Sequence, residues 1–144
     1  MGVGFVIARA GELGLVRRQL VQEKEEDMSI QIYYFSGTGN SLHVARELES
    51  RLPETVLVPI ISVLKDDKIE TTAETVGLVF PINNLTMPVA VKRFLQRVDM
   101  SSAKYIFAVT TRLCSDKVFL DLDIDKILKN QGESPDAYFS VEMP

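Results

Sequence analysis

The segment IQIYYFSGTGNSLHVAREL, residues 30–48, decides how the rest of the chain is read. Its first six residues, all but Gln31 apolar or aromatic, predict a buried strand. Apolar side chains then recur at helical spacing, at Leu42, Val44, Ala45 and Leu48. A strand, a glycine loop and a helix in this order gather backbone N–H groups at the carboxyl end of the strand. Such a point attracts anions.

The spacing within residues 36–41 does not match two well-known phosphate loops. A nucleoside triphosphate loop needs a lysine directly after its last glycine, and here Gly39 is followed by Asn40. A dinucleotide loop needs a small residue where Leu42 stands. It also needs an acidic residue at the end of the second strand, where residues 59–62 read PIIS. Both interpretations therefore fail.

What remains is an uncharged cradle for one phosphate monoester. Hydroxyls, a side-chain amide and two glycines that admit a ligand close to the backbone are supplied by Ser36, Gly37, Thr38, Gly39, Asn40 and Ser41. Hydrogen bonds to a charged acceptor contribute about 1.5 to 3 kcal/mol each, so that several convergent donors hold a dianion without lysine. The alternative is a tight turn with a helix cap and no ligand.

From residue 30 onward, short runs rich in β-branched and aromatic residues alternate with longer helical patterns. This alternation predicts an α/β domain with a parallel sheet. Five strands are expected, at residues 30–35, 55–60, 75–80, 104–110 and 137–141. Most of them are nearly continuous apolar runs, which is typical of strands covered on both faces.

The predicted helices carry their own end signals. Asn40 is expected to cap the first helix, and Pro53 stops it. A later helix is expected to have Thr86 as its cap and Pro88 in its first turn. Residues 120–125 alternate like a strand, but neighbouring parallel strands need a crossover, which favours a helix ending near Gly132.

Composition sets limits on the kind of protein. The 144 residues are 46% apolar and 25% charged, as in one ordinary globular domain. The 16 Lys and Arg are outnumbered by 20 Asp and Glu, which argues against nucleic acid as a partner. The single cysteine, Cys114, excludes an internal disulfide. Neither a membrane helix nor a signal peptide is predicted, so no membrane partner is expected and the expected location is cytoplasmic.

Residues 1–29 differ from the remainder, because glycines interrupt an apolar segment that ends in the charged run at residues 23–27. We interpret them as an N-terminal extension with an amphipathic helix at about residues 12–22. Residues 30–144 are expected to form the folded domain.

Beyond the glycine loop, two further runs give the chain a specific resemblance: GLVFP at residues 77–81 and PVAVKRF at residues 88–94. Together with residues 32–46 they resemble a flavodoxin-type domain, and more narrowly the flavodoxin half of bacterial proteins that fuse flavodoxin to a two-cluster ferredoxin. The resemblance covers residues 30–144. It implies a flavodoxin-like three-layer sandwich with a five-stranded parallel sheet of order 2-1-3-4-5. It also implies FMN at the switch point, with its phosphate in residues 36–41.

The same resemblance places the flavin ring between the loop at residues 81–85 and the loop at residues 110–114. The implied ring contacts come from Pro81, Ile82, Asn83, Asn84, Thr110, Thr111 and Arg112. Asn tolerates positive φ, so one of the two asparagines is expected to supply the peptide that hydrogen-bonds flavin N5. An Asn-Asn turn without a ligand is the alternative. Arg112 beside the N1 edge would raise the flavin potential, and a solvated loop arginine is the equal alternative.

The chain has no Trp, and its four tyrosines all fall in predicted strands. Stacking on the ring is therefore expected from Leu85 or Leu113. Losing two aromatic contacts weakens binding roughly ten- to a hundredfold. We predict weak or partial FMN occupancy.

The function implied is one-electron transfer between redox partners, such as a ferredoxin or a reductase. Neither the cysteine run of a ferredoxin half nor the final flavodoxin helix is present, so a C-terminally truncated domain is expected. Residues 3–21, or a second copy of the chain in a homodimer, are then expected to cover the exposed sheet face. Two alternatives remain: an NAD(P)H-dependent quinone or nitro reductase, and a flavin-free interaction module on the same fold.

Three other signals carry less weight. The run from Asp121 to Asp125 resembles the start of a calcium loop, but Lys126 and Gly132 occupy the positions that need glycine and glutamate. His43 has no companion nucleophile in sequence and is expected to pack or cap. Cys114 is expected to act as a small apolar filler. No metal site and no catalytic residue is predicted.

Overall fold

The computed structural model describes residues 4–9, 29–82, 87–112 and 120–142, with residues 4–9 and 120–123 described by their backbone alone. The strands are β1 (Gly4–Arg9), β2 (Ile30–Tyr34), β3 (Thr55–Pro59), β4 (Ile69–Glu70), β5 (Thr75–Pro81), β6 (Val98–Asp99), β7 (Tyr105–Arg112) and β8 (Ala137–Glu142). The helices are α2 (Asn40–Arg51), α3 (Ile60–Val63), α4 (Val89–Arg97) and α5 (Leu120–Lys129). The predicted helix at residues 12–22 lies outside the described residues.

Six strands form one parallel sheet in the order β1-β8-β7-β5-β2-β3. All five strands expected from the sequence are present, with ends shifted by at most two residues. The two-residue strands β4 and β6 pair with each other in a separate sheet. When every strand from residue 30 onward is counted, the five expected strands follow the order 2-1-4-6-7. This differs from 2-1-3-4-5 because β4 and β6 intervene in the chain.

The expectation of a five-stranded sheet was wrong at one edge. Strand β1 pairs in parallel with β8, from Gly4 opposite Ala137 to Arg9 opposite Glu142. Residues 4–9 therefore extend the sheet, whereas residues 3–21 were expected to cover its face. Local sequence pattern does not reveal this, because a strand's neighbour is chosen across the whole length of the chain.

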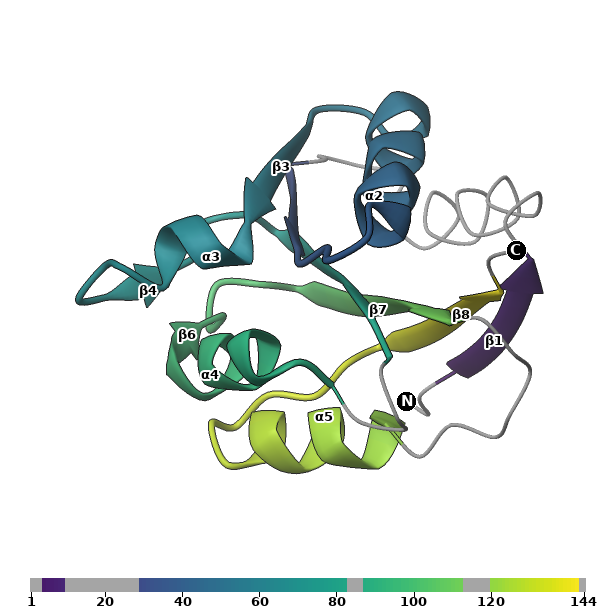
Figure 1. Ribbon diagram of the computed structural model, residues 1–144. Coiled ribbons are helices and arrows are strands. Elements are labelled where there is room, and N and C mark those ends of the chain that lie inside the picture. The colour runs from purple at the N-terminus through teal and green to yellow at the C-terminus, as the bar shows by residue number, and fades with distance from the viewer. Residues whose placement is uncertain (1–3, 10–28, 83–86, 113–119, 143–144) are drawn as a thin grey trace.

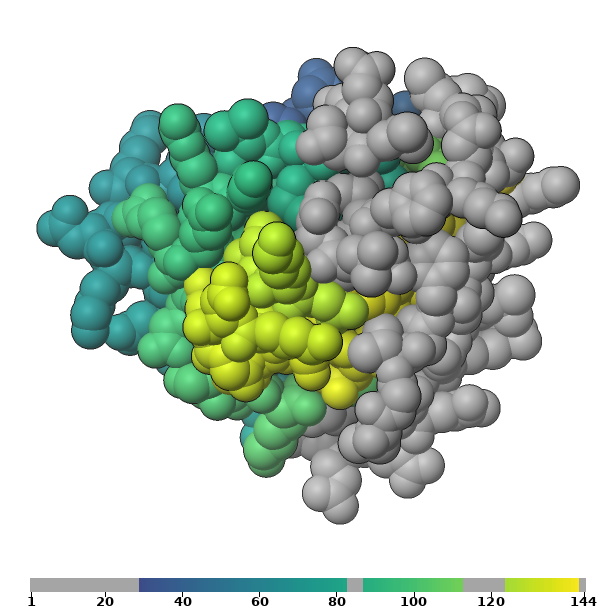
Figure 2. All heavy atoms as spheres, turned by 90° about the horizontal axis from the view of Figure 1, so that it is seen from below, coloured from purple at the N-terminus to yellow at the C-terminus, as the bar shows by residue number. Residues whose placement is uncertain are grey.

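Helices cover both faces of the sheet, which gives the three layers of an α/β sandwich (Figure 1). Helix α2 packs on β2, β3 and β5, and α4 and α5 lie side by side on the opposite face (Figures 1 and 2). Successive side chains of β5 alternate between the two cores: Leu78 and Phe80 lie on the α4 side, and Val79 lies on the α2 side. On β8, Phe139 and Val141 are buried on the α2 side of the sheet. The α2-side face of β8 is therefore covered.

Two helix starts differ from the expectation. Gly39, with φ of 98°, occupies the N-cap of α2, and Asn40 is the first helical residue. Helix α4 begins at Val89, because Pro88 at the N-cap has an extended ψ of 145°. The expected cap Thr86 lies outside the described residues. Val91, Phe94 and Leu95 form the apolar face of α4 and are fully buried. None of the helices in the described ranges has the length and apolar composition to span a bilayer.

The strand-like alternation at residues 120–125 is part of a helix, as the crossover argument predicted. Ile124 and Leu128 of α5 are fully buried. The helix ends in a Schellman motif, in which Glu133 N–H donates to the Leu128 carbonyl at 2.9 Å and Gly132 N–H donates to the Lys129 carbonyl at 3.0 Å. Gly132 has φ of 80°, which confirms the predicted glycine stop.

Replacing Gly132 by alanine is expected to lower the free energy of unfolding by about 1 to 2 kcal/mol, because an L side chain is strained at positive φ. A Cβ there would meet nothing within 4 Å, so the cost is conformational and not steric. Gly37→Ala is the matched control, since its added Cβ also meets nothing within 4 Å and its φ is not positive. Urea unfolding measures the free energy of unfolding of both variants. Equal stability of the two variants contradicts a conformational cost at the positive φ of Gly132.

Candidate functional site

The glycine loop lies at the carboxyl edge of the sheet, at the point where the strand order reverses. Strand β2 is paired on one side with β3, which follows it in the chain, and on the other side with β5. The N–H of Phe35 donates to the Val79 carbonyl at 2.9 Å and continues this pairing past the end of β2. Ligands of open α/β sheets bind in the crevice at such a switch point.

The loop itself is a turn closed on Ser36. The N–H of Gly39 donates to Ser36 Oγ at 3.0 Å, and the first helical bond runs from His43 N–H to the Gly39 carbonyl at 2.9 Å. No side chain among the described residues caps α2. The first-turn N–H groups of α2 are thus available to solvent or to an anion, at the positive end of the helix dipole.

The approach to this loop is open. Gly37, Thr38 and Gly39 are exposed, and a Cβ added at either glycine would meet nothing within 4 Å. A ligand therefore reaches the backbone without displacing a side chain of the described residues. His43 is also exposed, so it is not a core residue.

A buried hydrogen bond ties the helix end to β7. The hydroxyls of Ser41 and Thr111 lie 2.8 Å apart, and these two residues are only 1% and 2% exposed. The Thr111 carbonyl in turn accepts a hydrogen bond from Ile82 N–H at 2.9 Å. The structure thus brings together the glycine loop, the first residue after β5 and the end of β7. The sequence contains no signal for this contact, because Ser41 and Thr111 are 70 residues apart.

The remaining residues expected around the ring have mixed placements. Pro81 ends β5 and is half-buried, like Ile82. Thr110 and Arg112 belong to β7, which ends two residues later than predicted, and both are buried, whereas a loop had been expected. Strand alternation puts them on the face opposite Thr111. The other expected contacts, Asn83, Asn84, Leu85, Leu113 and Cys114, lie outside the described residues.

Tyrosine placement agrees with the sequence: all four tyrosines lie in strands. Tyr33 is buried against Phe94 of α4, with ring centroids 4.8 Å apart. Tyr34 and Phe35, at the end of β2, are half-buried and pack against the two cores. These aromatic side chains therefore pack into the cores on either side of the sheet.

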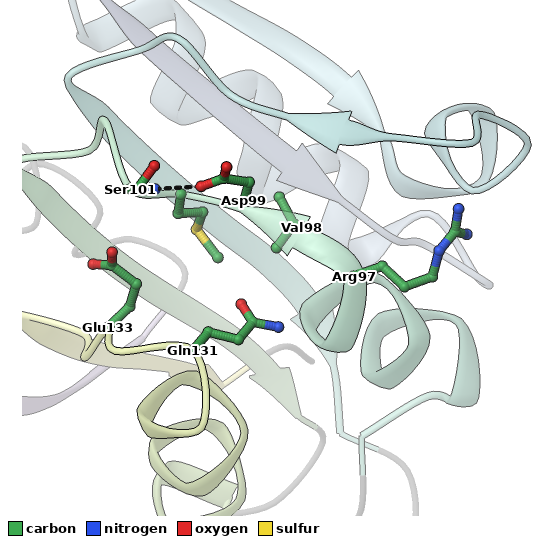
Figure 3. Close-up of a pocket in the computed structure, with 7 residues that line it drawn as sticks. Arg97, Val98, Asp99, Ser101, Gln131 and Glu133 are labelled. Carbon is green, nitrogen blue, oxygen red and sulfur yellow. Dashed lines mark hydrogen bonds between the residues drawn. The ribbon is translucent and has the colours of Figure 1, made fainter.

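A hollow of about 220 Å³ lies at the opposite, amino-terminal edge of the sheet, between β6 and the end of α5 (Figure 3). The Arg97 guanidinium donates to the Leu64 carbonyl at 3.0 Å and points away from the hollow. Hydrogen bonds from the Ser101 side chain and from the Ser101 N–H lower the pKa of Asp99. Burial is the main cause that raises the pKa of Glu133, and the negative charges of Asp99 and Asp136 raise it further. This carboxylate-lined hollow repels a phosphate.

The raised pKa of Glu133 predicts a pH-dependent gain for Glu133→Gln. A carboxyl with a raised folded-state pKa destabilises the fold once pH rises above its ordinary value of 4.5. The variant is therefore expected to be more stable than wild type at pH 7, by about 0.5 kcal/mol or less because the group is mostly solvated. The gain should vanish below pH 4.5. Urea unfolding across pH measures it, with the exposed Glu49→Gln as control; a pH-independent difference contradicts this cause.

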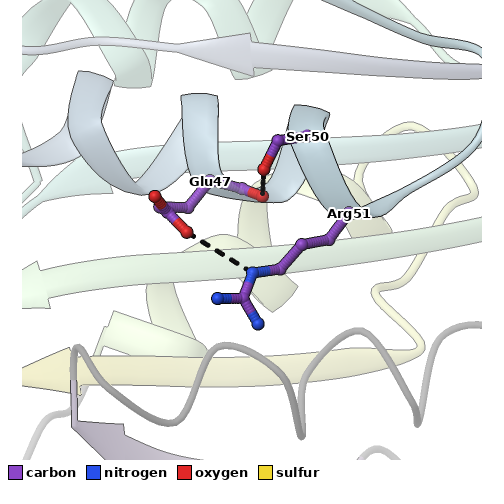
Figure 4. A network of polar contacts seen from close by, with 3 residues as sticks. All are labelled: Glu47, Ser50 and Arg51. Atoms are coloured by element: carbon purple, nitrogen blue, oxygen red, sulfur yellow. Dashed lines mark hydrogen bonds and ion pairs between the residues drawn. The ribbon is translucent and has the colours of Figure 1, made fainter.

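Among the residues that the structure describes, the other polar groups provide no further candidate ligand site. The described residues contain no group of three or more His, Cys, Asp or Glu side chains able to hold a metal. On α2, Glu47 and Arg51 form an exposed ion pair at 3.4 Å, and Ser50 Oγ donates to the Glu47 carbonyl at 2.8 Å (Figure 4). Exposed pairs of this type contribute about 0.3 to 0.5 kcal/mol and mark no ligand site.

Comparison with protein-family models gave no match, and comparison with curated proteins gave none either.

Proposed function

We propose that this chain is a flavodoxin-like, FMN-binding domain that transfers electrons one at a time between redox partners such as a ferredoxin and a reductase. One observation carries the proposal: an open glycine loop leads into the uncapped N-terminus of α2 at the switch point of a parallel sheet. The bound flavin supplies the electron chemistry, and the protein supplies position and electrostatics.

The phosphate of FMN fits the groups at the loop. Ser36 Oγ already accepts a hydrogen bond from Gly39 N–H, which leaves the Ser36 O–H proton to donate to an anion. Thr38 is exposed in the same loop, and the first turn of α2, which has no side-chain cap among the described residues, follows directly. These donors are neutral, which suits one phosphate monoester better than a triphosphate.

The ring is proposed to lie along the carboxyl edge of β5 and β7. At this edge, hydrogen bonds connect Thr111 to Ser41 and to Ile82, and Pro81 is paired with Thr111 in the sheet. The described aromatic side chains near this edge pack into the two cores. Their positions support the expectation that the ring is held weakly, through backbone and aliphatic contacts.

A binding titration tests the proposal. The purified chain is titrated into FMN and into riboflavin, with flavin fluorescence and visible absorbance as readouts. We expect quenching at micromolar protein, and binding of FMN at least about tenfold tighter than binding of riboflavin, because only FMN carries the phosphate. Equal affinity for the two flavins contradicts a phosphate cradle, and no quenching of either contradicts flavin binding. Full retention of tightly bound flavin through purification contradicts weak stacking.

A further inference from the structure

The hollow between β6 and the end of α5 has hydrogen-bond acceptors on both of its walls (Figure 3). Asp99 and Ser101 line it from β6 and the turn that follows, and Gln131 and Glu133 line it from the end of α5. Figure 3 shows the Glu133 carboxylate and the Gln131 amide oxygen turned toward the β6 wall. The lining therefore combines polar acceptors with an apolar surface, which the buried Met100 supplies.

The donor groups of these side chains are already used within the protein. The Gln131 amide nitrogen donates to the Leu95 carbonyl at 2.7 Å, which leaves the amide oxygen to accept. The Ser101 N–H donates to Asp99 Oδ1 at 2.9 Å, and the Ser101 side chain is also hydrogen-bonded to Asp99. Arg97 lines the hollow too, but its guanidinium points away and donates to a backbone carbonyl after α3. The remaining capacity of the lining is therefore mainly to accept hydrogen bonds.

Negative charge is in excess at this hollow. Burial, and then the charges of Asp99 and Asp136, raise the pKa of Glu133, because both effects disfavour the ionised carboxyl. Lys68 is near Asp99, but its ammonium is paired with the Glu70 carboxylate at 3.2 Å. Glu133 is thus held near two other carboxylates at a small cost in stability, and a bound cation removes that cost.

We propose that this hollow is a binding site for one alkylguanidinium group. A planar guanidinium carries five N–H donors and reaches acceptors on two walls, and its alkyl stem packs on Met100. The volume of about 220 Å³ is below the roughly 300 Å³ at which sites for drug-sized ligands begin, so it suits one such group. A metal ion is a poorer fit, since the described residues contain no group of three or more His, Cys, Asp or Glu side chains able to hold one.

The test uses two ligands of the same shape. N-butylguanidinium and the uncharged N-butylurea are titrated into the unmodified chain at constant ionic strength, and the amide signals of Ser101 and Glu133 are followed by NMR. We expect saturable binding of butylguanidinium with a Kd of about 1 mM or below, and butylurea at least about tenfold weaker, because charge-assisted hydrogen bonds are the stronger ones. Absence of a saturable shift with butylguanidinium, or equal binding of the two ligands, overturns the proposal.

Two variants test where the group binds. Glu133→Gln and Asp99→Asn keep the shape of the side chain but remove one charge, and each should weaken butylguanidinium binding about five- to tenfold. Glu133→Gln is expected to gain stability at pH 7, so its loss of binding does not come from unfolding. Glu49→Gln removes an exposed charge on α2 and is the matched control, with a Kd within about twofold of wild type. Equal losses in Glu133→Gln and Glu49→Gln would show an effect of net charge alone and contradict the site.

Two further measurements identify the source of the group and separate this site from the proposed function. Binding of N-acetyl-arginine N-methylamide with a similar Kd assigns the hollow to an arginine side chain of a partner polypeptide, and its exclusion assigns the hollow to a free guanidine. FMN affinity should be unchanged in Glu133→Gln, because the hollow and the glycine loop lie at opposite edges of the sheet. Failure to bind FMN therefore counts against the proposed function alone, and failure to bind butylguanidinium counts against this site alone.

Discussion

Replacing Gly77 by alanine is expected to destabilise the fold by about 3 kcal/mol, the upper part of the range for overpacking a core. Gly77 of β5 lies opposite Phe107 of β7, and a Cβ at position 77 would come within 2.4 Å of Phe107 Cζ and 2.8 Å of Cε2. Phe107 is fully buried in the core on the α2 side, so its ring has no free space to enter. Urea unfolding measures the loss.

The cause is tested by a double-mutant cycle with Phe107→Leu, which shortens the side chain that the new Cβ meets. Alanine at position 77 should cost much less in the Phe107→Leu background than in wild type, with an interaction free energy of about 1 kcal/mol or more. Gly37→Ala, whose added Cβ meets nothing within 4 Å, is the control for the substitution itself. Additive effects of Gly77→Ala and Phe107→Leu contradict a steric clash.

Thr38→Asp is expected to weaken FMN binding about a hundredfold or more. A carboxylate beside the phosphate dianion costs about 4 kcal/mol per pair of unit charges at 4 Å and an effective dielectric constant of 20, before salt screening. Thr38 is exposed in the open loop, so the substitution disturbs no core packing. Riboflavin lacks the phosphate, so its affinity should stay within about twofold.

The control for added charge is Thr72→Asp, at an exposed threonine just before β5 and so at the amino-terminal edge of the sheet. It should leave the affinity for FMN close to that of wild type. The loss in Thr38→Asp should also shrink at high salt, because ions screen exposed charges. An equal loss of FMN and riboflavin binding in Thr38→Asp points to misfolding of the loop and contradicts the phosphate placement.

Much of the fold was predictable because its signals are local. The five expected strands are short apolar runs, and the helical crossover at α5 follows from the need to join parallel neighbours. Gly132 marks the end of α5 because only a residue without a Cβ adopts its φ of 80° without strain. Helix starts were less predictable: Gly39 took the cap position expected for Asn40.

The candidate site was predictable only in part. Residues 36–41 are contiguous, so their spacing already indicated a phosphate cradle. The ring side is different, since Thr110 and Arg112 were expected in a loop and are buried in β7. The length of a strand depends on how far its neighbours continue to pair with it, and here β8 pairs with β7 as far as Arg112.

The sequence by itself determined the α/β class, the positions of five strands and the glycine loop before α2, because each depends on residues close together in the chain. Only the tertiary structure decided that β1 pairs with β8, that Gly77 makes room for Phe107 and that Thr111 meets Ser41. These are contacts between distant segments. They depend on sheet order, register and side-chain shape together, and no local pattern encodes that combination.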